Sequence, residues 1–141
     1  MERIEDFRGD HRWLSNFYWC PVEYEGDIYP STEHAYQAAK TLDPKERKAI
    51  REAKTFKEAK HLGYKVALRK DWENVKLGVM LDLLRQKFSS GQLREQLLST
   101  GDAYLVEGNT WGDTYWGVCN GKGQNHLGML LMQVREEIKP Q

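Results

Sequence analysis

The sequence predicts an α+β fold that is mostly α-helical and contains a small antiparallel β-sheet. Three observations indicate this fold. Apolar residues recur at helical spacing along residues 72–88 and again along residues 126–138. Polar residues typical of helix starts precede several shorter segments between residues 31 and 101. Alternating, β-like residues with a glycine turn signal occupy residues 14–30.

The first half of the chain begins with the β segment, in which Gly26-Asp27 is the expected two-residue hairpin turn. A helix then extends to about residue 42, capped by Ser31 or Thr32. The next helix begins at Asp43-Pro44, with the aspartate as N-cap and proline in the first turn. Residues 55–58 form a capping box for a short helix that ends at Gly63.

The second half of the chain begins with a long helix over residues 72–88, for which Asp71 is the expected N-cap. A shorter helix covers residues 92–98, and residues 104–107 have the composition of a strand. A loop rich in Gly, Asn, Trp and Asp follows. Asn125 is the expected N-cap of the last helix.

Composition limits the class of protein. The 141 residues suit one domain, 1–141, and carry 21 basic and 21 acidic side chains. This balance excludes a strongly basic nucleic-acid footprint over the chain as a whole and leaves a local basic patch open. It favours a small anionic ligand or one modified nucleotide. Cys20 and Cys119 form no disulfide framework, and neither a signal peptide nor a membrane span is apparent. We therefore expect a soluble, cytoplasmic protein that does not contact a membrane.

The first candidate site lies in residues 31–40, which read Ser-Thr-Glu-His-Ala-Tyr-Gln-Ala-Ala-Lys. On a helix, Glu33, Gln37 and Lys40 are spaced by four and three residues and share one face. An acid, an amide and an amine would then project into one cleft. The alternative is an ordinary solvated helix face. The four histidines lack ligand spacing, so we expect neither a metal site nor a cofactor.

The second candidate is a stripe on the long predicted helix that contains Lys76 and Lys87 together with apolar residues. Such lysines either extend along the apolar surface to reach water or face a cleft that holds an anion. The sequence favours the first interpretation, and the second is the alternative.

The third candidate is the loop of residues 107–117, where carboxylates and indoles alternate with small residues. This mixture suits a pocket in which rings stack on a planar base and an acid lies near a sugar. A tightly turned structural loop is the alternative. Residues 121–125 lead directly into the last helix, and backbone amides at its start could hold a phosphate.

Several blocks of the sequence, read in order, resemble the NADAR family, also called YbiA-like proteins. Residues 14–18 read Leu-Ser-Asn-Phe-Tyr and residues 31–40 form the glutamate–histidine helix. Asp-Thr-Tyr-Trp-Gly follows at residues 113–117, and the last block covers residues 123–135. The resemblance extends over nearly the whole chain and implies the YbiA-like fold. It also implies cleavage of an N-glycosidic bond between a ribose that carries phosphate and an amine leaving group.

Within that family, some members act on phosphoribosyl intermediates of riboflavin synthesis and others remove ADP-ribose from guanine. The resemblance therefore implies a phosphorylated ribose or ADP-ribose substrate, either free or on nucleic acid. The candidate catalytic residues are Glu33, Lys40 and Asp113. The candidate substrate-binding residues are Arg8, Ser15, Asn16, Phe17, Gln37, Trp72, Lys76, Lys87, Glu107, Trp111, Trp116 and Asn125.

The roles of these residues follow from the chemistry. A carboxylate, Glu33 or Asp113, would stabilise the positive charge that develops on the sugar and direct water. Lys40 permits a second route, in which its amine attacks the anomeric carbon and forms a Schiff base. Basic residues would pair with phosphate, and tryptophans would stack on the base. The sequence leaves the two routes open. It also leaves open a non-catalytic module that binds ADP-ribose or a modified nucleotide.

Overall fold

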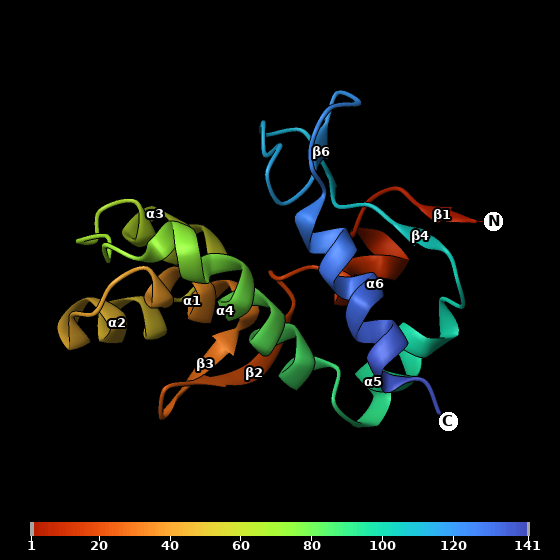
Figure 1. Ribbon diagram of the computed structural model, residues 1–141. Helices are drawn as coiled ribbons and strands as arrows, with labels where there is room; N and C mark the ends of the chain where they lie inside the picture. Colours follow the sequence, from red (N-terminus) through yellow and green to blue (C-terminus); the bar gives the residue numbers. More distant parts are fainter. Residues whose placement is uncertain (1, 141) are drawn as a thin grey trace. The chain divides into compact units, whose positions relative to one another are not determined.

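The structure is a computed structural model that describes residues 2–140. Within those residues it contains six α-helices, one 3-10 helix and three two-stranded sheets, which confirms the predicted α+β, mostly helical class (Figure 1). The chain forms two compact units. One contains residues 16–87, and the other is built from the chain up to residue 15 and from residue 88 onward.

The unit of residues 16–87 begins with an antiparallel hairpin of β2 (Trp19–Tyr24) and β3 (Asp27–Ser31). Tyr24 pairs with Asp27, so the turn residues are Glu25 and Gly26, not the expected Gly26-Asp27. Both turn residues have positive φ, as a two-residue hairpin turn of this kind requires. Glu25 adopts this conformation with its carboxylate paired to Arg47 at 2.7 Å.

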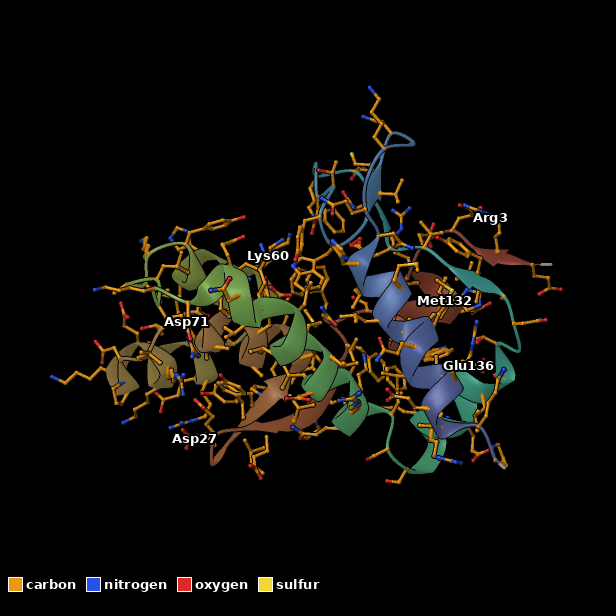
Figure 2. The ribbon with its side chains drawn as sticks, viewed as in Figure 1. Arg3, Asp27, Lys60, Asp71, Met132 and Glu136 are labelled. Atoms are coloured by element: carbon orange, nitrogen blue, oxygen red, sulfur yellow. The ribbon has the colours of Figure 1, made fainter. Side chains whose placement is uncertain are left out.

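Four helices complete this unit: α1 (Thr32–Ala39), α2 (Pro44–Arg51), α3 (Phe56–Gly63) and α4 (Trp72–Lys87). The predicted caps are confirmed at Ser31, Asp43 and Thr55, whose side chains accept backbone N–H groups of the first turns. Asp71 instead directs its carboxylate to Arg69, at 2.6 and 3.1 Å. Figure 2 labels Lys60 on α3, Asp71 beside the start of α4 and Asp27 at the start of β3.

Helix α1 is the centre of this unit and packs against the other three helices and both hairpin strands. All eight of its residues are buried. Three of them are alanines, whose small side chains let neighbouring elements approach closely. The alternative of a solvated helix face is therefore wrong for α1. Its polar side chains lie inside the unit and must find partners there.

The second unit contains α5 (Gly91–Ser99), α6 (His126–Ile138) and a short 3-10 helix, Gly9–Leu14, which the sequence did not predict. β1 (Arg3–Ile4) pairs in parallel with β4 (Tyr104–Leu105), and β5 (Gly108–Asn109) pairs in parallel with β6 (Val118–Cys119). These parallel pairs add to the antiparallel hairpin that was expected. α6 packs against β4 and α5 (Figure 1).

Asn125 precedes α6 in the left-handed conformation, with φ 54°, and makes no side-chain cap. Its Nδ2 donates to the Leu105 carbonyl and its Oδ1 accepts from the Glu107 amide, both at 2.9 Å. Asn125 therefore occupies the predicted N-cap position, but its side chain does not cap the helix. Both polar atoms of the Asn125 side chain bond to backbone groups in or next to β4. The side chain therefore links the start of α6 to that strand.

Both cysteines are free thiols. None of the helices within residues 2–140 combines the length and apolar composition of a membrane-spanning segment. No grouping of three or more His, Cys, Asp or Glu side chains suitable for a metal ion occurs in the same residues.

Candidate active site

The acid and amide of the first candidate site lie together in the interior of the unit of residues 16–87. Glu33 and Gln37 have exposed fractions of 6% and 5%. Gln37 Nε2 donates to Glu33 Oε2 at 2.6 Å, and the backbone N–H of Glu33 donates to the Asn16 carbonyl at 3.0 Å. These bonds fix a carboxylate in a position largely shielded from water, where its interactions with neighbouring charges are strengthened.

Asn16 itself is buried beneath the start of α1. Its Nδ2 lies 3.5 Å from the Met80 sulfur, and its Oδ1 has no hydrogen-bond partner among the described residues. A buried acceptor without a donor is unfavourable. The binding role predicted for Asn16 stays a prediction, and Oδ1 is the atom of this side chain that lacks a donor.

Lys40 follows directly at the C-terminal end of α1. Its Nζ lies 5.5 Å from the centre of the Tyr36 ring and 5.6 Å from that of Tyr64. The Arg69 amide donates to the Lys40 carbonyl at 2.7 Å, and the Arg69 guanidinium reaches the Ala39 carbonyl at 3.4 Å. Arg69 thus satisfies carbonyl groups at the helix end and holds Lys40 in place.

The pKa of Lys40 is lowered from its ordinary value, chiefly because burial penalises the charged ammonium. Repulsion from Lys60 and Lys76 lowers it further, while the carboxylate of Glu33 opposes the shift. The three lysines and Glu33 are therefore one electrostatic group. Such an amine is more often neutral, and hence nucleophilic, than an exposed lysine.

Helix α3 supplies residues that sequence reasoning missed. Phe56 stacks on Phe17 with ring centres 3.9 Å apart and an angle of 7° between the planes. Lys60, one turn later, places its Nζ 5.5 Å from the Phe17 ring centre. Tyr64 lies a further four residues on, against Lys40. The four-residue spacing of Phe56, Lys60 and Tyr64 indicates that these residues share one side of a helix. The sequence did not indicate that this helix would pack against α1.

Three other predicted residues of this unit, Trp72, Lys76 and Lys87, contact neighbouring side chains of the protein. Trp72 is buried and packs on Tyr36, with ring centres 5.2 Å apart, so it supports the Tyr36 ring that lies beside Lys40. Lys76 pairs with Glu73 at 2.8 Å. Lys87 is only 3% exposed, with its Nζ 5.7 Å from the Tyr18 ring centre, and burial lowers its pKa to about 7. The interpretation that Lys87 extends along the apolar surface to reach water is therefore wrong.

The remaining predicted residues belong to the other unit: Arg8, Ser15, Glu107, Trp111, Asp113, Trp116 and Asn125. Asp113 organises its loop, because its Oδ1 accepts from the amides of Tyr115 and Trp116 at 3.1 and 2.9 Å. Glu107 Oε2 accepts from Asn109 Nδ2 at 3.1 Å. These bonds match the alternative interpretation of the segment as a tightly turned loop.

The expected phosphate site at the start of α6 is not formed by free amides. The N–H groups of Asn125, His126 and Leu127 donate to the carbonyls of Gly117, Tyr115 and Trp116. Since loop carbonyls already occupy these donors, this prediction is wrong for the described conformation. Arg8 is exposed and paired with Asp6 at 3.3 Å, while the Ser15 amide donates to the Arg12 carbonyl.

The two tryptophans of this loop differ in exposure. Trp111 is half exposed, with an exposed fraction of 50%. Trp116 is partly buried and lies edge-on to Tyr115, with ring centres 4.9 Å apart. Stacking of either ring on a base stays a prediction.

Comparisons with known proteins define the class. The NADAR domain model matches residues 5–139. The chain is 44% identical over 133 residues to N-glycosidase YbiA of Escherichia coli K12, covering 92% of this chain and 82% of that protein. The NMR structure of Escherichia coli YbiA matches with a TM-score of 0.84 and 40% identity, covering 98% of this chain and 86% of that chain.

A riboflavin biosynthesis protein of Vibrio vulnificus is 38% identical over 134 residues, which cover 92% of this chain but 36% of that protein. An N-glycosidase of Nostoc punctiforme is 40% identical over 133 residues, with 89% and 85% coverage. The protein is thus an enzyme of the class that hydrolyses N-glycosyl bonds. The chain belongs to the NADAR family.

Proposed function

We propose that this enzyme hydrolyses the C–N bond between a phosphorylated ribose and a base-like amine. The substrate is either ADP-ribosylated guanine, free or in nucleic acid, or a phosphoribosyl intermediate of riboflavin synthesis. One observation carries the proposal. A fixed, buried carboxylate, Glu33, and an amine of lowered pKa, Lys40, lie two turns apart on the same helix and interact electrostatically.

The chemistry assigns each group a step. As the bond between the anomeric carbon and the leaving amine lengthens, positive charge develops on the sugar, and the Glu33 carboxylate stabilises it. The neutral Lys40 amine attacks that carbon and forms a new C–N bond. The bond to the leaving amine breaks, and that amine departs with one proton from Lys40. The bond between the anomeric carbon and the ring oxygen then breaks, and the ring oxygen takes the second proton of the Lys40 amine, which gives an open-chain imine. Water then hydrolyses the resulting imine, which frees the sugar and restores Lys40.

Binding of the sugar phosphate is assigned to the same unit. Lys60 and Lys76 place positive charge near Lys40, as a substrate phosphate requires. The unpaired Asn16 Oδ1 can accept from a ribose hydroxyl. The carboxylate role goes to Glu33 and not to Asp113, because two backbone amides already bond to Asp113 Oδ1.

Product analysis tests the activity and separates the two substrates. The purified protein is incubated with ADP-ribosylated guanosine and, separately, with a phosphoribosylamino-pyrimidine. We expect release of free ADP-ribose or of ribose 5-phosphate from at least one of them. Binding of either compound without release would identify a non-catalytic module and overturn the proposal.

The covalent route is tested by reduction with borohydride during confirmed turnover. The imine should be trapped as a stable sugar adduct, and peptide mapping should place it on Lys40. The matched control is Lys40→Arg, which keeps the charge but cannot form the imine, and should give neither adduct nor normal turnover. Turnover without any adduct would favour attack by water assisted by Glu33.

A further inference from the structure

Lys40 lies between two tyrosine rings that differ in their surroundings. Tyr36 is buried, and Trp72 packs against it. Tyr64 has 79% of its surface exposed, more than any other exposed large apolar or aromatic side chain in the described residues. Both ring centres lie within 5.6 Å of the Lys40 Nζ. One ring is therefore part of the core, whereas the other offers its surface to solvent beside the reactive amine.

The backbone of Tyr64 is held firmly despite this exposure. Its amide donates to the carbonyls of Lys60 and His61 at 3.2 and 3.3 Å, and thereby closes α3. Gly63, the preceding residue, lies directly against the Gln37 side chain of α1, so there is no space for a larger residue. This close approach fixes the end of α3 against the helix that carries Glu33 and Lys40. The backbone of Tyr64 is thus held next to the contact between α3 and the helix that carries the acid and the amine.

We propose that Tyr64 is a specificity-determining residue that recognises the leaving group by stacking its ring on the planar base. The inference rests on the proposed function for the position of the scissile bond at Lys40. Exposed aromatic surface beside the site can cover a flat heterocycle without displacing any protein contact. A sugar phosphate that lacks a base would leave this ring uncovered. Tyr64 would then contribute to binding only when a base is present.

The test compares two probes, guanosine 5′-monophosphate and ribose 5-phosphate, which share the sugar phosphate and differ in the base. Their dissociation constants are measured by calorimetry for the wild type, Tyr64→Ala, Tyr64→Phe and the control Leu68→Ala. Leu68 is an exposed apolar residue of the same unit with no part in the site. The thermal stability of each variant is measured in parallel, and an exposed substitution should change it little.

We expect the wild type to bind the nucleotide more tightly than ribose 5-phosphate. Tyr64→Ala should weaken nucleotide binding at least about fivefold, the lower range for one base stacked on an aromatic ring. Its binding of ribose 5-phosphate should stay within about twofold of the wild type. Tyr64→Phe and Leu68→Ala should resemble the wild type for both probes.

Three results would overturn the proposal. They are a wild type without preference for the nucleotide, a Tyr64→Ala variant with unchanged nucleotide binding, and a Tyr64→Ala variant that binds both probes equally less tightly. Equal weakening would assign Tyr64 to the support of Lys40 and not to base recognition. These binding measurements require no turnover, so the absence of hydrolysis would contradict the proposed function while leaving the assignment of Tyr64 to be decided on the probes.

Discussion

The ionisation of Lys40 depends on its burial and on the charges around it. The Glu33 carboxylate favours the protonated amine, while burial together with Lys60 and Lys76 favours the neutral form. The balance lowers the pKa of Lys40, so burial and like charges outweigh the single attractive partner. A lysine at the end of an exposed helix would instead be stabilised in its charged form by the helix dipole. Single substitutions around this pair should therefore change activity with little change in fold.

At the scale of single residues, Glu33→Gln should lower turnover at least about 100-fold while leaving the fold intact. The new amide oxygen can still accept from Gln37 Nε2, so the hydrogen bond of the wild type is preserved without the negative charge. Steady-state kinetics and thermal denaturation check the two parts. Near-normal turnover with unchanged stability would remove Glu33 from the mechanism.

The pH dependence of Lys60→Met tests the electrostatic group. If neutral Lys40 is the nucleophile, the rate rises with pH as its ammonium loses a proton. Removing the Lys60 charge removes a repulsion that lowers the pKa of Lys40, so that pKa rises and the rising limb moves to higher pH. The profile of kcat against pH measures the shift.

The matched control is Lys57→Met, since Lys57 lies on the same helix, is exposed and takes no part in the group. Its profile should coincide with that of the wild type. A Lys60→Met limb that stays in place or moves to lower pH would contradict the assigned coupling.

At the scale of elements, the close packing of α3 on α1 determines the geometry of the site. Gly63 abuts the amide of Gln37, and Gln37 in turn holds Glu33. The Gln37 side chain of α1 lies where a larger residue at position 63 would place its Cβ, so this contact fixes the spacing of the two helices. The same packing brings Lys60 and Tyr64 to the end of α1.

Gly63→Ala should therefore destabilise the protein by about 1–3 kcal/mol and reduce turnover, because the added methyl group must displace Gln37 or separate the helices. The control is Gly78→Ala in α4, where an added methyl group meets nothing within 4 Å. That change should stabilise the helix by about 0.5–1 kcal/mol. Chemical denaturation measures both, and a Gly63→Ala protein as stable as the wild type would contradict the packing argument.

At the scale of the whole molecule, one of the two units is continuous in sequence and the other is not. Residues 16–87 are contiguous, whereas the other unit needs both the beginning and the end of the chain. In that unit β1 pairs with β4, which lies about a hundred residues later. The second unit therefore cannot form from one continuous segment.

We expect the chain to unfold as the single domain predicted from its length, in one cooperative transition. Calorimetry checks this through the ratio of the van't Hoff and calorimetric enthalpies, which should be close to one. The ratio should also be unaffected by Gly78→Ala, which alters only one helix. Two resolved transitions would show that the units are separate domains.

Much of the fold could be predicted from local sequence. The helix starts at Pro44 and Phe56 follow from side-chain caps, and the helix that begins at His126 follows from apolar spacing, because both signals depend on neighbouring residues. The hairpin was placed correctly, but its turn was wrong by one residue. Asn125 has the composition of a cap, yet its side chain bonds to backbone about twenty residues earlier. Local patterns do not contain such distant partners.

The sequence by itself determined the family, the α+β class and the shared helix face of Glu33, Gln37 and Lys40. Only the tertiary structure decided that this face is buried, and that α3 adds Lys60 and Tyr64 beside it. The physical reason is that helical spacing is a property of adjacent residues. Burial, a lowered pKa and the surroundings of a reactive amine depend on elements that meet through packing, irrespective of their separation along the chain.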